Sequence, residues 1–149
     1  MDSQDERWMR MALLEAEQAA EEGEVPVGAV VVCNGKIVGR GHNMTETLKD
    51  VTAHAEMMAI TAAANTLGGK YLPNCTLYVT VEPCAMCAGA IGWSQMGRLV
   101  YGAYDRKRGF ESYFCSDPSP LHPKTIVESG LLEEECAALM SDFFKARRK

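Results

Sequence analysis

TLYVTVEPCAMCAGAIGWS, at residues 76–94, runs from a β-rich segment straight into a helical one. Residues 76–81 alternate in character and are rich in β-branched types, which predicts a strand. Pro83 suits a helix start, because its ring presets the helical φ and its missing N–H would find no partner in the first turn. We therefore expect a helix from about Cys84 to Ser94. A strand that passes at once into a helix indicates an α/β domain.

The segments on either side continue this alternation. An apolar, β-branched run at residues 28–33 precedes Asn34-Gly35, a strong hairpin signal, since both turn positions need φ > 0. Beyond it we expect a return strand at 36–39, a polar loop at 41–52, a helix at 53–65 ending near Gly68-Gly69, a strand at 99–101, an ordered loop at 110–123 and a strand at 125–127. Such an order favours a central sheet flanked by helices.

Helices are also expected at both ends of the chain. Ser3-Gln4-Asp5-Glu6 has the form of a capping box, in which Ser3 would bond the helix N-terminus and Glu6 would reach back. This helix should continue to Glu22 and end at Gly23. Its apolar face is formed by Trp8, Met11, Ala12, Ala16 and Ala19. The last helix is expected at residues 131–148, acidic at its start and basic at its end, as the helix dipole favours.

Length and composition indicate one domain over residues 1–149, with a sizeable core. No apolar run is long enough to span a bilayer, and residues 1–10 lack the apolar region of a signal peptide, so a cytoplasmic location is expected. The net charge of −5 argues weakly against a general nucleic-acid binder. Basic residues nevertheless gather at 106–108 and 145–149 and could hold an RNA segment. On charge alone, solvated surface residues remain the preferred interpretation.

Six cysteines are present, at positions 33, 75, 84, 87, 115 and 136. Only Cys84 and Cys87 form a close pair. Without a secretion signal, such a pair indicates metal or redox chemistry more often than a disulfide.

Two short segments together predict a catalytic metal site. Cys84 and Cys87 are three residues apart and share one helical face, and His54 lies at the start of another expected helix. Two thiolates and one imidazole give zinc three protein ligands and leave one tetrahedral position for water, which is the mark of a catalytic site. Helix N-termini also favour thiolates, because their free N–H groups and positive dipole end lower the thiol pKa.

Glu56 lies two residues after His54 and should point beside the metal-bound water. Zinc lowers the pKa of such a water to about 7. The carboxylate could accept its proton and pass it to a ring nitrogen, hydroxide would attack the amino-bearing carbon, and ammonia would leave. His-x-Glu followed by Pro-Cys-x-x-Cys is the signature of zinc nucleobase deaminases. Taken singly, each residue has an ordinary alternative: core or redox thiols, a core histidine, a surface acid. Cys33 or Cys75 could also complete a structural zinc site, although buried apolar thiols suit them better.

Beyond these motifs the chain resembles bacterial tRNA-specific adenosine deaminases of the cytidine deaminase-like superfamily. The resemblance covers almost the whole chain, including residues 24–30, 41–43, 52–56, 77–91, 102–105 and 135–144. It implies a three-layer, single-domain cytidine deaminase-like fold with a central mixed five-stranded sheet, a homodimer, one zinc ion per chain, and hydrolytic conversion of adenosine to inosine at the wobble position of a tRNA anticodon. A flipped base is needed, because the reacting carbon is unreachable in a stack.

The resemblance also implies substrate-binding residues. Asn43 would hydrogen-bond the base, and the backbone at Ala55 would line its pocket. Asp105 and Lys107 would approach neighbouring nucleotides, and Phe144 and Arg147 would touch the RNA loop. Asn43 could instead be only a turn residue, and Phe144 could simply pack its helix. Many relatives carry Asn-His where this chain has Leu121-His122-Pro123, which leaves open whether His122 contacts RNA.

Two other functions share the zinc motif. A deaminase of free guanine or cytosine would need the same core, and the acidic net charge mildly favours it. A non-enzymatic zinc-binding module would not need Glu56, whose presence argues against it. The helix after Cys87 is small and apolar on nearly every side, so it is either fully internal or shared between the sheet and a second subunit.

Overall fold

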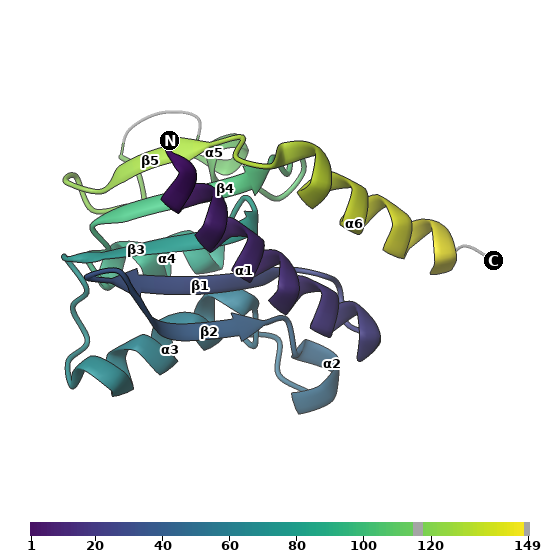
Figure 1. Cartoon of the computed structure of the whole chain (residues 1–149), viewed down its shortest axis with the longest axis horizontal. Helices are drawn as coiled ribbons and strands as arrows, with labels where there is room; N and C mark the ends of the chain where they lie inside the picture. Colours follow the sequence, from purple (N-terminus) through teal and green to yellow (C-terminus); the bar gives the residue numbers. More distant parts are fainter. Residues whose placement is uncertain (115–117, 148–149) are drawn as a thin grey trace.

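Five strands form one mixed sheet in the order β2-β1-β3-β4-β5 (Figure 1). The computed structural model describes residues 1–114 and 118–147. β1 (Gly28–Cys33) pairs antiparallel with β2 (Lys36–His42) and with β3 (Cys75–Val81). β3, β4 (Arg98–Ala103) and β5 (Ile126–Ser129) run parallel. The predicted mixed five-stranded sheet is therefore confirmed, as is the hairpin, whose turn residues Asn34 and Gly35 have φ of 51° and 73°.

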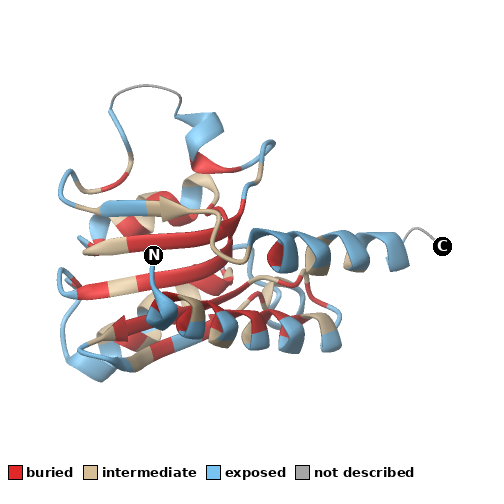
Figure 2. Ribbon diagram, turned by 45° about the horizontal axis from the view of Figure 1, so that its top comes forward, coloured by how far each residue is buried: buried red, intermediate tan, exposed pale blue. Residues whose placement is uncertain are grey.

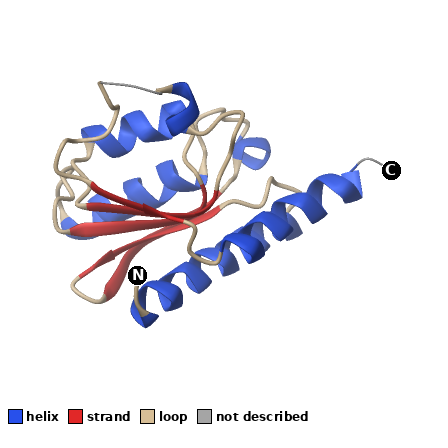
Figure 3. Ribbon diagram, turned by 90° about the horizontal axis from the view of Figure 1, so that it is seen from above, coloured by secondary structure: helices blue, strands red, loops and turns tan. Residues whose placement is uncertain are grey.

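Helices cover both faces of the sheet and make three layers (Figure 3). On one face lie α1 (Ser3–Glu21) and α6 (Glu133–Arg147), and on the other lie α3 (Ala55–Leu67) and α4 (Ala85–Trp93). Two short helices, α2 (Thr45–Leu48) and α5 (Phe110–Tyr113), interrupt loops. Among the described residues, no helix combines the length and the apolar character that crossing a membrane requires.

The core is divided into two apolar clusters, one on each face of the sheet. Because side chains alternate along a strand, Val31 and Leu77 pack toward α3 and α4, whereas Val30 and Tyr78 pack toward α1. The central strands are buried on both faces, while much of the outer part of α6 is exposed (Figure 2). The buried sheet thus provides a rigid support for the loops and helices that begin at the ends of its strands.

Four local predictions differ from the structure. The predicted capping box is wrong: Asp2 is the N-cap, its carboxylate accepts the Asp5 N–H at 3.0 Å, and the Asp5 carboxylate accepts the Asp2 N–H at 3.1 Å. The expected loops at 41–52 and 110–123 contain α2 and α5, and β2 is longer than predicted. The other described boundaries differ from the predicted ones by two residues at most. Residues 115–117 and 148–149, with the cysteine at 115 and the last residue of the predicted helix at 131–148, lie outside the described residues.

A buried ion pair explains why the cap lies at Asp2 and Asp5. Arg98 of β4 donates from Nη1 to Asp5 Oδ1 at 2.7 Å and from Nη2 to Asp5 Oδ2 at 2.9 Å. The Tyr78 hydroxyl donates to the same carboxylate at 2.5 Å, and Arg98 Nε donates to Glu128 of β5 at 2.6 Å. Asp5 therefore turns inward and ties α1 to β3 and β4, and Arg98 extends this network to β5. The Arg98 guanidinium holds the pKa of Asp5 well below its usual range.

Replacing Asp5 by Asn should destabilise the protein. The substitution removes the negative charge that faces the Arg98 guanidinium in a nearly buried site. This loss should lower the free energy of unfolding by about 3 kcal/mol at pH 7. Because folding lowers the pKa of Asp5, its contribution is complete above the unfolded value of about 3.9 and is lost as the pH falls toward the folded value. Urea unfolding across a pH series should therefore show the difference between wild type and Asp5→Asn shrinking below about pH 4.

Glu6→Gln is the matched control, because Glu6 pairs with Arg10 on the exposed side of the same helix turn. It should change the free energy of unfolding by less than about 0.5 kcal/mol. Equal effects of the two substitutions would refute the role assigned to the ion pair.

Candidate metal centre and active site

Three sulfur and nitrogen donors meet where α3 and α4 begin. His54 is the N-cap of α3, Cys84 is the N-cap of α4, and Cys87 lies in the first turn of α4. The His54 Nδ1 atom lies 3.6 Å from Cys84 Sγ and 3.5 Å from Cys87 Sγ. All three donor atoms lie within 4.8 Å of one another. The structure therefore brings together the three side chains predicted as metal ligands.

The spacing of these donors fits zinc. With Zn–S near 2.3 Å and Zn–N near 2.0 Å, tetrahedral coordination separates sulfur from nitrogen by about 3.5 Å. Both observed nitrogen–sulfur distances agree with this separation. Within residues 1–114 and 118–147, no fourth histidine, cysteine or acidic side chain joins the group. Cys33 and Cys75 face each other at the opposite end of β1 and β3, so neither completes a structural zinc site.

The close approach of α3 to the sheet depends on two glycines of β2, Gly39 and Gly41. A Cβ atom at Gly41 would lie 2.8 Å from the Ala55 carbonyl oxygen and 2.6 Å from the Met58 Cβ. Only a residue without a side chain lets the first turn of α3 lie this close to β2. His54 is therefore held at the sheet by the packing of the helix that it begins.

The two thiols share their protons unequally. The Cys87 thiol hydrogen-bonds Cys84 and, with help from His54, lowers the pKa of Cys84 to about 4. The neighbouring thiolate, with burial, raises the pKa of Cys87 far above its usual range. The thiolate form is therefore favoured at Cys84, the N-cap of α4, where free N–H groups and the helix dipole favour negative charge.

Glu56 is a buried carboxyl group beside this cluster. It lies in the first turn of α3 and is 3 % exposed. Burial raises the pKa of Glu56 to about 7. A carboxyl group with this pKa can both take up and release a proton near neutral pH. The structure thus places Glu56 next to the His54, Cys84 and Cys87 cluster, at the wall of a pocket.

A pocket of about 280 Å³ opens over the cluster. Its walls are apolar at Val25, Val27 and Val81 and polar at a few points. The predicted residues Asn43, His54, Ala55, Glu56, Cys84 and Asp105 all line it. This volume lies at the lower limit of small-molecule sites, at about 300 Å³, and suits a single base better than a larger ligand.

Asn43 serves the local turn and the pocket at once. Its side-chain oxygen accepts the Thr45 N–H at 3.3 Å, and its own N–H donates to the Val27 carbonyl at 3.1 Å. Its amide nitrogen has no hydrogen-bond partner among the described residues. The turn interpretation is therefore correct for the oxygen, while the amide nitrogen remains available to a ligand.

A wider groove of about 730 Å³ continues from the pocket. The two share Val25, Val81, Asp105, Arg108 and Met140. Lys107 and Phe144 line the groove, and Arg106 stacks over the Tyr104 ring at 5.2 Å. Three of the residues predicted to approach RNA, Asp105, Lys107 and Phe144, therefore gather beside the pocket, and Phe144 is 41 % exposed there.

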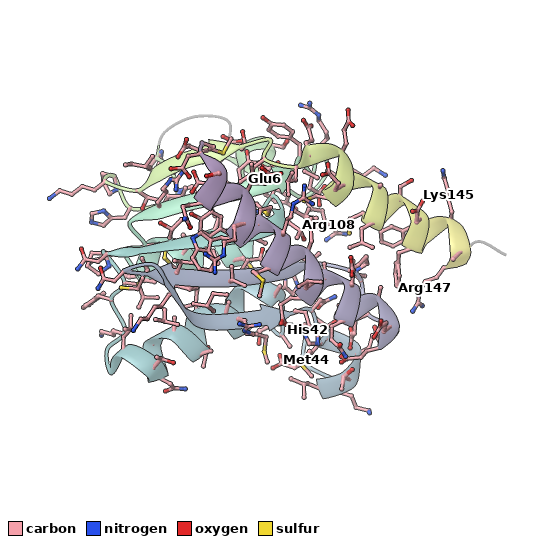
Figure 4. All side chains as sticks on the ribbon, in the orientation of Figure 1. Glu6, His42, Met44, Arg108, Lys145 and Arg147 are labelled. Carbon is pink, nitrogen blue, oxygen red and sulfur yellow. The ribbon has the colours of Figure 1, made fainter. Side chains whose placement is uncertain are left out.

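Arg147 and His122 lie elsewhere. Arg147, at the outer end of α6 (Figure 4), donates to the Gly23 carbonyl and stacks over Phe143 at 4.5 Å. It lines a neighbouring cleft that shares Phe144 with the groove. His122 lines a separate cleft against α4, beside Trp93, which has no residue in common with the base-sized pocket.

Three residues that shape the site were not singled out from sequence. Arg108 lines the pocket but looked like one member of a basic run. Glu24 is buried, accepts N–H groups of Glu46 and Thr47, and so holds α2 beside the pocket. Glu82 is buried next to the Pro-Cys motif and accepts N–H groups from the Asp105–Glu111 segment. Only the position of Glu82 next to that motif could have signalled its importance.

The chain is similar to known proteins in sequence and in fold. Residues 2–103 match the family model for the cytidine and deoxycytidylate deaminase zinc-binding region. The tRNA-specific adenosine deaminase of Bacillus subtilis (strain 168) is 46% identical over 149 residues, which covers 99% of this chain and 92% of that protein. A solved structure from a study of A-to-I editing by tRNA:A34 deaminases at the wobble position of transfer RNA has a TM-score of 0.83 and 45% identity, covering 89% of this chain and 98% of that one. The guanine deaminase from Nitrosomonas europaea has a TM-score of 0.78 and 25% identity, covering 93% and 83%.

Purified protein should hold one zinc ion per chain, and Cys87→Ala should lose it. Loss of residues that merely orient a ligand weakens metal binding by about 10–100-fold, so loss of a ligand should exceed roughly 100-fold. Zinc content by mass spectrometry and a chelator competition would measure this. Cys33→Ala is the control, because its thiol lies at the far end of β1. Zinc retained in Cys87→Ala but lost in Cys33→Ala would place the metal elsewhere.

Proposed function

Because the chain belongs to the tRNA-specific adenosine deaminases, within the family that shares the cytidine and deoxycytidylate deaminase zinc-binding region, we propose that it converts adenosine to inosine at the wobble position of a tRNA anticodon. One observation carries the chemistry: a cluster of His54, Cys84 and Cys87 lies beside the buried Glu56, at a pocket sized for one base. The groove lined by Asp105, Lys107 and Phe144 supports an RNA substrate.

His54, Cys84 and Cys87 would hold zinc, which supplies Lewis-acid activation of water when bound. Glu56 takes a proton from the attacking water and passes it to a ring nitrogen of the base as the new C–O bond forms at the amino-bearing carbon. The proton of the new hydroxyl group then passes to the amino group, and the C–N bond breaks as ammonia leaves. Burial suits Glu56 to this role, because it raises the carboxyl pKa to about 7 and keeps bulk water from exchanging the proton.

The pocket must receive a base that has left the stack. Asn43 can donate from its amide nitrogen to an acceptor on the base edge. The backbone at Ala55, in the first turn of α3, borders the same space. We expect Asn43 to orient the ring so that its amino-bearing carbon faces the metal and Glu56.

The RNA around the base would lie in the adjoining groove. Lys107, with Arg106 and Arg108, can pair with phosphates, and the exposed Phe144 can stack on a splayed base. Asp105 borders both the pocket and the groove. Arg147 is bonded to the Gly23 carbonyl, so any RNA contact from Arg147 has to compete with that bond.

The homodimer and the cytoplasmic location remain predictions. Trp93 on α4 is 83 % exposed, next to Gly89, Gly92 and Leu121. A large apolar side chain left in water at the end of a small, apolar helix suits contact with a second subunit. A cytoplasmic location follows from the proposed tRNA substrate.

Deamination of a free base is the second candidate, because the guanine deaminase from Nitrosomonas europaea shares the fold. The two functions are separable by substrate. Zinc-loaded protein incubated with an anticodon stem-loop should produce inosine, detected by nucleoside mass spectrometry. Guanine, cytosine and free adenosine should release little ammonia under the same conditions. An unchanged stem-loop together with rapid release from a free base would favour the second candidate.

Glu56→Gln should abolish most of the activity and keep the metal. The amide has nearly the same shape as the carboxyl group but cannot carry the proton, and such carriers contribute about 10²–10⁴-fold. Single-turnover deamination of the stem-loop would measure the loss. Zinc content and thermal stability serve as controls, and Glu17→Gln, on the exposed face of α1, should remain fully active. Comparable rates for wild type and Glu56→Gln would exclude the proposed proton carrier.

A further inference from the structure

Glu82 is a buried carboxylate that the proposed chemistry does not use. It lies between β3 and Cys84 and is 5 % exposed. Its Oε1 accepts the Asp105 N–H at 3.1 Å, and its Oε2 accepts the Glu111 N–H at 2.9 Å. The two oxygens therefore hold both ends of the Asp105–Glu111 segment. Hydrogen bonds from N–H groups to a carboxylate are stronger than neutral ones.

The middle of this segment is pressed against the same carboxylate. A Cβ atom at Gly109 would lie 2.2 Å from Glu82 Cδ and 2.4 Å from each carboxylate oxygen. Gly109 forms an isolated antiparallel bridge with Cys84, and the Phe110 N–H donates to the Pro83 carbonyl at 2.8 Å. The Asp105–Glu111 segment is thus joined to the Pro83-Cys84 stretch at two adjacent residues, Gly109 and Phe110.

The segment also carries side chains that face the proposed substrate. Asp105 Oδ1 accepts the N–H groups of Lys107 at 3.1 Å and of Arg108 at 3.0 Å, which closes a tight turn. Asp105 and Arg108 line the pocket, and Lys107 lines the groove. The position of these groups over the pocket depends on where Glu82 holds the ends of the segment.

We propose that Glu82 is a positioning residue for substrate binding. Its carboxylate fixes the Asp105–Glu111 segment against the Cys84 stretch, so that the basic turn lies at the mouth of the base pocket. This inference rests on the proposed function, since it assigns the turn to an RNA that surrounds the target base. Glu82 also borders the pocket, but each of its carboxylate oxygens already accepts an N–H group of the segment, so we assign its role to the segment and not to direct contact with the base.

Glu82→Gln tests this with little change in size. The amide replaces one acceptor oxygen with an NH₂ group that faces an N–H donor, and a buried donor left without its acceptor costs roughly tenfold. We expect KM for the anticodon stem-loop to rise by roughly tenfold, kcat to stay within about twofold, and zinc content to be unchanged. Gly109→Ala, which displaces the same contact from the other side, should behave alike and provides a second test if Glu82→Gln folds poorly.

Glu134→Gln, on the exposed start of α6, is the control for charge. Removing a negative charge should, if anything, favour RNA binding. A higher KM in Glu82→Gln alone therefore cannot arise from net charge. Two results would overturn the proposal. An unchanged KM in both Glu82→Gln and Gly109→Ala would show that Glu82 has no role in substrate binding. A fall in kcat with loss of zinc would show that Glu82 supports the metal centre instead.

Limited trypsin digestion gives a readout that needs no activity. Cleavage after residues 106–108 should be several-fold faster in Glu82→Gln than in wild type, because the turn is released. Equal cleavage rates would overturn the proposal. If wild type left the stem-loop unchanged while cleavage still differed, the proposed function would fail, and the bracing of the segment by Glu82 would stand.

Discussion

The site depends on the convergence of two helix N-termini at one end of the sheet. α3 and α4 both begin there, and their N-cap residues are His54 and Cys84. Free N–H groups and the positive dipole end of α4 favour a thiolate at this place. The packing that fixes the two helices therefore also fixes the donor set, and the metal site does not require a separately ordered loop.

The same end of the sheet collects the rest of the proposed machinery. Asn43 follows β2, Glu82 follows β3, and Asp105 follows β4. Each of these positions lies within two residues of the end of a strand, where the chain leaves the sheet and side chains can surround a ligand. The pocket and the groove share one wall for this reason, and Glu82 links that wall to Cys84, a proposed metal ligand.

Much of this arrangement was predictable from sequence. The features that could not be predicted are either too short to show a pattern or depend on contacts between distant residues. The hairpin at Asn34-Gly35 and the strand before Pro83 follow from local turn chemistry and β-branched runs. α2 and α5 are four residues each, too short to show a helical period. The Asp5–Arg98 pair spans 93 residues of sequence, and no local pattern announces it. Likewise, the spacing of Cys84 and Cys87 predicts one shared face, but only the fold places His54 3.5 Å from Cys87.

The central claim is that zinc has three protein ligands from two helix starts and one remaining position open to a small molecule. X-ray absorption at the zinc edge of the loaded protein measures this shell directly. It should show two sulfur neighbours at about 2.3 Å and two lighter neighbours at about 2.0–2.1 Å. A third sulfur, or a shell of nitrogen and oxygen alone, would contradict the account.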